Sequence, residues 1–276
     1  MDKPYLPTLL DGDSYFTVDA VNQTLLKQVL KSPAHAREYL KSPMKPTPAM
    51  LLGTAVHTAL LEPNLFDSQI VVIPDINKRT KEGKLQWKAF TAGAEGKTII
   101  TKQQAVDCIQ IGHRVARSDA VNRIVNSGAH EVSIGFEDEQ TGLACKARID
   151  ILDTNGKHVV DIKTTADASM YGFSRSCAKF LYHLQASFYL RAASGHSKGI
   201  EAYKDGWIFT IIAVETSAPY GVAIYKFDQR AICEGDDLVD IALKSWSEAK
   251  MFDEFKDYPD EVQELSLPAW ALKEQE

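Results

Sequence analysis

The stretch RIDILDTNGKHVVDIKTT, residues 148–165, decides the fold, because it reads as two strands joined by a turn at TNG. Side chains alternate between the two faces of a strand. Arg148 and Asp150 are therefore expected to share one face of the first strand, and Asp161 and Lys163 one face of the second. If the two strands pair through the turn, Asp150 and Asp161 come close together.

Two carboxylates brought close together repel each other, and each raises the pKa of the other unless a cation lies between them. Asp150 and Asp161 therefore indicate a site for a hard divalent cation, with Mg²⁺ as the first candidate and Mn²⁺ as a second. Lys163 would then orient an attacking water or neutralise charge that develops on a phosphate. The alternative is a solvated strand face with a surface ion pair between Asp161 and Lys163, and the short D-x-K pattern leaves both possibilities open.

The composition of the whole chain is that of an ordinary globular protein. It has 276 residues, 45% of them hydrophobic and 25% charged, so it can bury a full-sized core. We expect a cytoplasmic protein that does not bind membranes, because the sequence has neither an apolar run of about 18 residues nor a secretory signal at its start. The net charge of −6 weighs against nucleic-acid binding unless basic residues gather on one surface.

The pattern of special residues excludes several chemistries. The four cysteines are scattered without a C-x-x-C pair, which fits reduced thiols better than disulfides, a zinc ribbon or an iron–sulfur cluster. Neither a G-x-S-x-G elbow nor a phosphate-binding P-loop is present, so the sequence does not support a serine hydrolase or an NTPase.

A single domain over residues 1–276 is expected, because no repeat, low-complexity tract or long linker divides the chain. Apolar residues at helical spacing predict N-terminal helices within residues 17–62. The first is expected over residues 17–32, and the second opens with Ser32 as its cap and Pro33 in its first turn. The polar, basic segment that follows them is expected to be a surface loop or a partly ordered helix.

The region 128–250 is predicted to hold a central sheet and the helices that cover it. Alternating residues predict three antiparallel strands, followed by a long helix over residues 174–193 and two more strands. A closing helix is expected over residues 228–251. Helices and strands in this order predict an α/β fold with a central mixed β-sheet flanked by helices.

Five short patterns of chemically active residues occur in order along the chain. They are GTAVH at Gly53 to His57, a glutamate at the head of a strand at Glu131, Asp150, DIK at Asp161 to Lys163, and QASFY at Gln185 to Tyr189. Together they resemble the PD-(D/E)xK nuclease superfamily, and within it the exonuclease VIII (RecE-type) nuclease domain, over roughly two-thirds of the chain. The resemblance implies a restriction-endonuclease-like nuclease core with its catalytic sheet and helices in region 128–250.

The resemblance also implies a set of metal ligands. Asp150 and Asp161 would be the metal-binding acids, and the main-chain carbonyl of Ile162 would be a further ligand. His57 would complete the metal site from the helical side. The implied cofactor is Mg²⁺, with Mn²⁺ as the other candidate.

Further residues would take part in catalysis by the same resemblance. Lys163 would be the catalytic lysine, and Glu131 the acid that leads the preceding strand. Gln185 and Tyr189 lie one helical turn apart and would form the nuclease helix motif, which can contact DNA phosphate or brace the metal-binding carboxylates.

The implied activity is a metal-dependent exodeoxyribonuclease on linear double-stranded DNA. RecE-type enzymes degrade one strand from its 5′ end, leave a 3′ single-stranded tail for a single-strand annealing (RecT-type) recombinase, and form homo-oligomeric rings, trimers or tetramers, around the DNA. Basic residues that could line such a ring lie within residues 78–84, near Trp87, and at Lys146 and Arg148. A solvated loop is the alternative for residues 78–84.

Two other functions are compatible with the same residues. One is a sequence- or structure-specific endonuclease of the same superfamily, and the other is a DNA-binding module without catalysis. The complete set of Asp150, Asp161, Lys163 and His57 argues against the second, because a purely structural role would not need all four.

Overall fold

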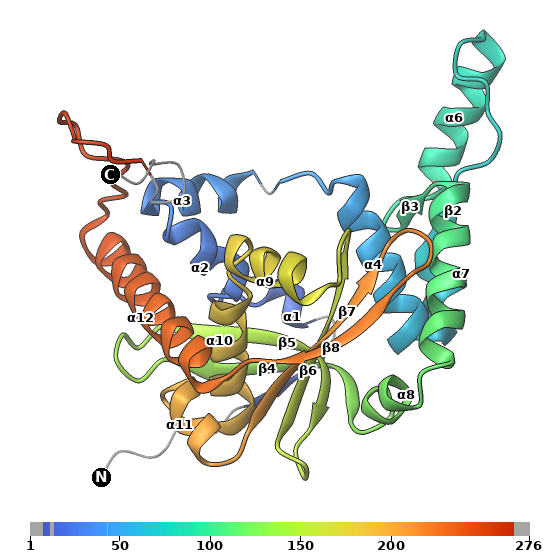
Figure 1. Ribbon diagram of the computed structural model, residues 1–276. Coiled ribbons are helices and arrows are strands. Elements are labelled where there is room, and N and C mark those ends of the chain that lie inside the picture. The colour runs from blue at the N-terminus through green and yellow to red at the C-terminus, as the bar shows by residue number, and fades with distance from the viewer. Residues whose placement is uncertain (1–7, 12–13, 43, 268–276) are drawn as a thin grey trace, which may run out of the picture.

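A six-stranded mixed sheet forms the centre of the protein, whose computed structural model describes residues 8–11, 14–42 and 44–267 (Figure 1). In sheet order the strands are β1 (Thr8–Leu10), β4 (Ala129–Glu137), β5 (Ala144–Asp153), β6 (His158–Thr165), β7 (Ile208–Glu215) and β8 (Val222–Lys226). Neighbouring strands are antiparallel, except that β6 and β7 are parallel and are connected through helices. The predicted α/β fold with a central mixed sheet flanked by helices is confirmed.

The N-terminal helices are more broken than predicted. They are α1 (Ser14–Thr17), α2 (Gln23–Val29), α3 (Pro33–Lys41) and α4 (Pro48–Leu61). The helix predicted over residues 17–32 does not form as one piece, because the side chain of Asn22 accepts a 2.9 Å hydrogen bond from the main-chain nitrogen of Leu25 and caps α2 there. Val21 forms a bridge to β5 instead. Ser32 caps α3 as predicted.

The long helix predicted over residues 174–193 is two helices, α9 (Met170–Lys179) and α10 (Tyr182–Ser194). Leu181 between them has a φ of 52°, a left-handed conformation that interrupts an α-helix. After this break α10 lies on the sheet, and its residues from Leu184 to Ala192 are all buried. α11 (Gly199–Lys204) follows, and α12 (Gln229–Phe252) begins after its cap Asp228, as predicted.

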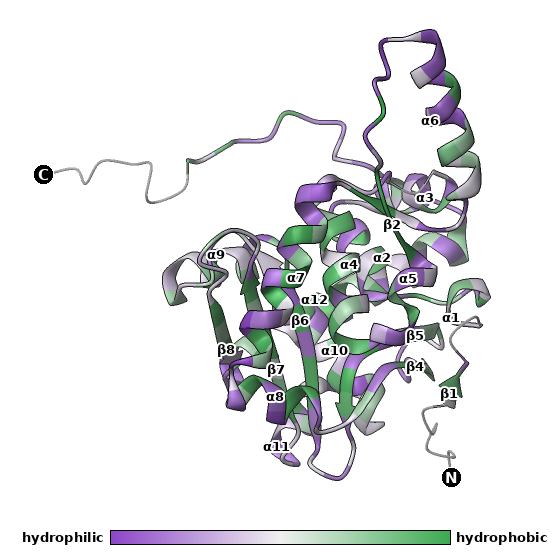
Figure 2. Cartoon of the chain, turned by 90° about the vertical axis from the view of Figure 1, so that its right-hand side faces the viewer, coloured by the Kyte–Doolittle hydropathy of each residue, from purple (hydrophilic) through white to green (hydrophobic). Residues whose placement is uncertain are grey.

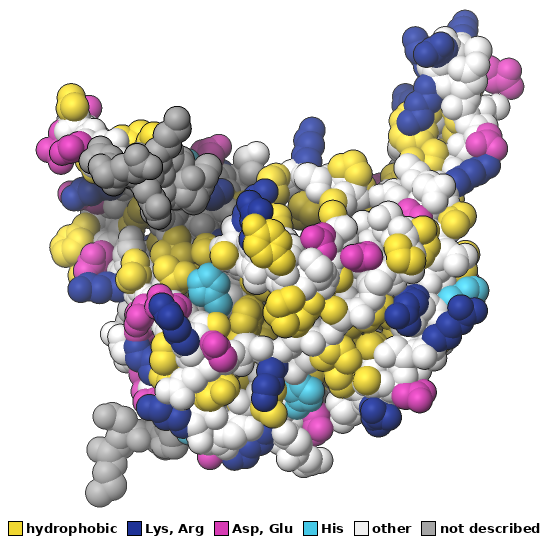
Figure 3. All heavy atoms as spheres, viewed as in Figure 1, with side chains coloured by type: hydrophobic (Ala, Val, Ile, Leu, Met, Phe, Trp, Pro, Cys, Tyr) yellow, Lys and Arg dark blue, Asp and Glu magenta, His cyan; other side chains and the backbone are white. Residues whose placement is uncertain are grey.

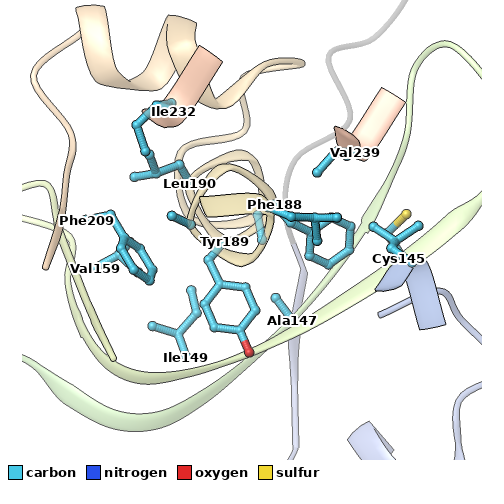
Figure 4. Close-up of a cluster of buried hydrophobic side chains, with 14 of the residues drawn as sticks. Cys145, Ala147, Ile149, Val159, Phe188, Tyr189, Leu190, Phe209, Ile232 and Val239 are labelled. Carbon is cyan, nitrogen blue, oxygen red and sulfur yellow. The ribbon is translucent and has the colours of Figure 1, made fainter. Parts of the chain in front are cut away.

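Hydrophobic side chains pack on both faces of the sheet. On one face α10 contributes Phe188 and Tyr189, which lie over Ala147 of β5 (Figure 4). On the other face α4 and α7 (Lys102–Ala116) cover Val160 and Ile162 of β6. Full burial of each large apolar side chain stabilises the folded chain by about 1.5–3 kcal/mol. The sheet is therefore fixed between two helical layers.

One helix, α6 (Lys81–Gly93), projects away from the rest of the protein (Figures 1 and 2). A small parallel sheet of β2 (Ile70–Val72) and β3 (Thr98–Ile100) connects it to the body. Of the two possibilities left by the sequence, a helix therefore forms here. The remaining short elements are η1 (Pro63–Leu65), α5 (Phe66–Gln69) and α8 (Asp119–Val125). No helix in the described part of the chain is long and apolar enough to span a membrane.

Candidate active site

Asp150 lies where the pairing between β5 and β6 ends. The last paired residues on this side are Ile151 and Val160. Beyond them the main-chain nitrogen of Ile162 donates a 2.7 Å hydrogen bond to Oδ2 of Asp150 instead of to a carbonyl of β5. The carboxylate of Asp150 therefore takes a place in the seam between the two strands.

The regular alternation of β5 also breaks at Asp150. Ile149 packs in the hydrophobic cluster around α10, whereas Ile151 packs in the cluster on the opposite face. In a regular strand these two side chains would share a face. Glu131, on the neighbouring strand β4, has a φ of 51°, which is rare outside glycine. This local distortion places Asp150 on the side of α4.

His57 on α4 holds the carboxylate of Asp150. Its Nε2 atom lies 2.9 Å from Oδ2 of Asp150, and its Nδ1 atom lies 2.8 Å from the carbonyl oxygen of Gly53. Burial alone lowers the pKa of His57, but attraction by Asp150 outweighs it and raises that pKa to about 9. Both ring nitrogens are then donors, as these two acceptors require. Burial raises the pKa of Asp150, and attraction by His57 outweighs it, so that pKa is lowered.

The glycine of the GTAVH pattern allows α4 to approach the sheet. A Cβ atom added to Gly53 would lie 3.3 Å from Oγ1 of Thr164 on β6, which is closer than most such contacts. The carbonyl of Gly53 also accepts from His57, as described above. The pattern therefore combines a close helix–sheet approach with an oriented imidazole.

Asp161 is held by two side chains inside the protein. The amide nitrogen of Gln185 donates a 2.6 Å hydrogen bond to Oδ1 of Asp161, and Nζ of Lys163 lies 2.6 Å from Oδ2. Burial raises the pKa of Asp161 in spite of the attraction by Lys163. Because Asp161 is only 1% exposed, the alternative of a solvated strand face is wrong.

One oxygen of Asp161 is left without a hydrogen bond. Oδ2 instead forms the 2.6 Å ion pair with Lys163. Among the described residues no other group donates to this buried oxygen. A buried carboxylate oxygen with a free lone pair is suited to a metal cation.

Gln185 and Tyr189 have separate roles although they lie on one face of α10. Gln185 reaches Asp161, so it braces a carboxylate as one of the two predicted roles suggests. Tyr189 packs edge-on against Phe209, with 6.5 Å between ring centres, in the hydrophobic cluster (Figure 4). Burial raises the pKa of Tyr189 well above its usual value, and the charge of Asp161 adds to this.

Glu131 lies beside the acids but is already paired. Its Oε2 atom accepts a 2.6 Å hydrogen bond from Nε of Arg148, and Glu62 lies 3.7 Å from the same guanidinium. Burial raises the pKa of Glu131, and repulsion from Asp150 adds to this. Arg148, predicted to line a DNA channel, is therefore engaged with two acids of the protein.

Lys146, the other residue predicted beside the acids as a DNA contact, holds the N-terminal segment instead. It is 8% exposed, and its Nζ atom donates 2.7 Å hydrogen bonds to the carbonyl oxygens of Tyr15 and Val18. Alternation gave the correct face of the strand, but it could not show that another part of the chain covers this lysine.

A cleft of about 710 Å³ leads from the surface to Asp150 and His57. Its walls come from α1, α4, β4 and β5, and they include Glu131, Arg148 and the exposed ring of Phe16. The site is therefore open to a ligand on the side of α4.

The donor atoms of the site suit a hard divalent cation, although they are not gathered around one point. No three His, Cys, Asp or Glu side chains in the described ranges lie close enough together to enclose a metal ion. Asp150 is bound to His57, and Asp161 to Lys163. Two carboxylates would hold the cation, and His57, whose ring nitrogens both donate here, would become a third ligand by losing one ring proton. The predicted role of the Ile162 carbonyl stays a prediction, because only its main-chain nitrogen is seen to contact Asp150.

Residues 22–265 match the family model of a PDDEXK-like domain of unknown function (DUF3799). The chain belongs to this PDDEXK-like family. The resemblance to the PD-(D/E)xK nuclease superfamily is thereby confirmed. None of the curated proteins matches the chain.

The structure is also similar to a crystal structure described as "Putative exonuclease" from Eubacterium rectale. The TM-score is 0.63, and the two share 14% sequence identity over 97% of this chain and 99% of that chain. At this identity the similarity shows the fold. Membership of the PDDEXK-like family, together with the buried acids and lysine, supports a nuclease.

Two residues beside the acids carried no signal in the sequence. Tyr182, at the start of α10, has its ring centre 5.0 Å from Nζ of Lys163. Lys27 on α2 lies 5.6 Å from the centre of the same ring. They belong to distant segments of the chain, so that only the fold brings them to Lys163.

Proposed function

We propose that this protein is a metal-dependent exodeoxyribonuclease that degrades linear double-stranded DNA from the 5′ end and leaves 3′ single-stranded tails. The observation that carries the proposal is the pair of buried acids, Asp150 in the seam between β5 and β6 and Asp161 on β6, with Lys163 paired with Asp161. The family supports phosphodiester hydrolysis, and the direction and duplex specificity are inferred from the resemblance to RecE-type nucleases.

A divalent cation, Mg²⁺ or Mn²⁺, would supply a bound water of lowered pKa and polarise the scissile phosphate. Asp150 and Asp161 would hold it, and His57 would join them as a ligand after losing one of its ring protons. Gln185 fixes the orientation of Asp161 through Oδ1, and Oδ2, which is paired with Lys163, would be the oxygen that contacts the cation. Each predicted acidic ligand is thus held in place by another side chain, Asp150 by His57 and Asp161 by Gln185.

Lys163 supplies the positive charge that phosphoryl chemistry needs at the reacting oxygen atoms. Burial lowers the pKa of Lys163, but attraction by Asp161 outweighs it and raises that pKa, so the side chain is an ammonium at neutral pH. Its proton-bearing nitrogen can orient the attacking water and stabilise charge on the phosphate oxygens. It cannot act as a general base in this state.

Double-stranded DNA is the proposed substrate, and the projecting helix α6 supports it. Figure 3 shows Lys and Arg side chains gathered at the tip of this arm. Nζ of Lys78 lies 3.0 Å from the centre of the Trp87 ring, and this contact connects the loop before α6 to the helix itself. A basic arm of this kind can contact phosphate although the net charge of the chain is −6.

We extend the proposal to partners and location on the resemblance alone. The protein would act in the cytoplasm as a homo-oligomeric ring, a trimer or tetramer, and would deliver its 3′ tails to a single-strand annealing (RecT-type) recombinase.

The proposed mode is tested with linear and covalently closed circular duplexes of the same sequence, incubated with Mg²⁺. We expect the linear duplex to lose a 5′ label before a 3′ label, and the circle to stay intact because it has no ends. Cleavage of the circle would show the alternative, a sequence- or structure-specific endonuclease. Binding of both duplexes without cleavage, with either Mg²⁺ or Mn²⁺, would indicate the DNA-binding module.

A further inference from the structure

Two lysines, Lys27 and Lys163, lie against the ring of Tyr182. Their Nζ atoms are 5.6 Å and 5.0 Å from the ring centre. Lys163 comes from the end of β6, whereas Lys27 comes from α2, more than a hundred residues earlier in the chain. The fold therefore brings a second ammonium group to the edge of the proposed catalytic site.

The two ammonium groups differ in their partners. Lys163 is paired with Asp161 at 2.6 Å. The ammonium group of Lys27, by contrast, has neither an ion pair nor a hydrogen bond to any residue in the described ranges, and it lies over the Tyr182 ring. Burial lowers the pKa of Lys27 to about 7, and repulsion from Lys163 adds to this, while Asp161 acts in the opposite direction. A cation in such a place is destabilising unless an anion joins it.

The position of Lys27 is fixed by the helix that carries it. Leu25, Leu26 and Val29 of α2 are buried in the hydrophobic cluster, and Asn22 caps the helix. A lysine can usually extend its ammonium group into water along its flexible stem. Here the anchored helix fixes the backbone of Lys27, and the side chain lies beside the Tyr182 ring.

We propose that Lys27 binds a phosphate of the DNA strand that is being cleaved and thereby positions that strand beside Lys163. This inference rests on the proposed function, because the anion that a nuclease brings to its acids is a phosphodiester. An unpaired ammonium group close to the site and held on a rigid helix is suited to a phosphate oxygen as a point charge. Lys27 is thus a positioning residue for the substrate, distinct from Lys163, which acts at the reacting phosphate.

The test measures binding of a fluorescent linear duplex by the full chain in Ca²⁺, over a series of salt concentrations. The variants are Lys27→Gln and Lys27→Arg, and Lys31→Gln is the matched control because Lys31 is exposed just beyond the same helix. We expect Lys27→Gln to weaken binding about tenfold and to reduce the slope of log K against log salt by about 0.9, the contribution of one phosphate contact. Lys27→Arg should keep most of the affinity, and Lys31→Gln all of it.

A second measurement needs no substitution, so it holds even if Lys27→Gln fails to fold. Brief acetylation of the native protein near neutral pH, read by mass spectrometry, should modify Lys27 readily because of its lowered pKa. Added duplex should protect Lys27 and leave Lys31 reactive.

The outcomes separate this inference from the proposed function. If the native protein cleaves DNA while Lys27→Gln binds with unchanged affinity and slope, or Lys27 is not protected, the inference on Lys27 is overturned and the nuclease stands. If Lys27→Gln reduces the slope but the native protein never cleaves, the phosphate contact stands and the nuclease fails. A native protein that does not bind DNA overturns both.

Discussion

Gln185 and Asp161 are joined by a 2.6 Å hydrogen bond between α10 and β6, and neither residue is more than 3% exposed. The amide nitrogen occupies Oδ1, so that Oδ2 is left to pair with Lys163. Because α10 is buried from Leu184 to Ala192, the position of Asp161 is set by the core of the protein. The hydrophobic core thereby fixes a polar atom of the proposed active site.

Replacing Gln185 with Leu should weaken metal binding without removing a ligand. Residues that orient metal ligands typically contribute about 10–100-fold in affinity, and we expect a loss of this size for Mn²⁺ measured by calorimetry. Gln103→Leu, on the exposed face of α7, serves as the control. Equal Mn²⁺ affinity in Gln185→Leu and the native protein would show that Gln185 does not orient a metal ligand.

Replacing His57 with Ala should destabilise the metal-free protein. The substitution removes the 2.9 Å contact with Asp150 and leaves that carboxylate with one fewer donor. A hydrogen bond to a charged group contributes about 1.5–3 kcal/mol, and we expect the free energy of unfolding in urea with EDTA to fall by that amount. His113→Ala, an exposed histidine of α7, should change it by less than about 0.5 kcal/mol. A similar value for the two variants would argue against a structural bond between His57 and Asp150.

Asp236 should be a major determinant of stability away from the site. Its buried carboxylate accepts hydrogen bonds from Ser187, from Arg191 at 2.6 Å, and from the main-chain nitrogens of Gly199 and Ile200, so it joins three helices. Removing one partner of a buried charged pair costs about 3–5 kcal/mol, which we expect for Asp236→Ala in urea unfolding.

The neighbouring residue Asp237 provides the matched control for Asp236. It lies on the same helix and is exposed, so Asp237→Ala should leave the free energy of unfolding within about 0.5 kcal/mol of the native value. A loss below about 1 kcal/mol for Asp236→Ala would contradict the role of Asp236 in joining α10, α11 and α12.

Thiol reactivity should report the packing of both hydrophobic clusters. Burial raises the pKa of Cys108 and Cys177 to about 11 and that of Cys145 to about 12, whereas Cys233 is only half-buried. We expect the native protein to react with a thiol reagent near neutral pH at Cys233 alone, and the unfolded protein to react at all four cysteines. Fast modification of Cys145 in the native state would show that β5 is not packed as described.

Local signals account for the parts of the fold that were predicted correctly. Ser32 before Pro33 and Asp228 before the last helix are N-caps whose side chains accept from the main-chain nitrogen three residues on, so the start of each helix is fixed locally. Asn22 is a cap of the same kind, so the break between α1 and α2 carried a readable signal that the helical spacing of the apolar residues outweighed. Leu181 carried none, because a leucine in the left-handed region is held there by tertiary packing.

Some features of the candidate site likewise follow from local sequence, and others depend on tertiary packing. Asp161 and Lys163 are two positions apart in a strand pattern, and their shared side follows from alternation. The distortion at Asp150 and Glu131 does not follow, because it depends on how two strands and α4 fit together. Lys27 was also beyond prediction, since only the fold brings α2 to the ring of Tyr182.

Hydrolysis of end-labelled linear duplex DNA by Asp161→Asn tests the central claim most directly. This substitution keeps the shape of a side chain that is 1% exposed but removes the charge on the proposed metal ligand. With Mg²⁺ we expect the native protein and Asp237→Asn to release label, and Asp161→Asn and native protein with EDTA to release at least 100-fold less, as is typical when a main electrostatic contributor is removed. Equal release by Asp161→Asn and the native protein would contradict a metal-dependent nuclease site at this seam.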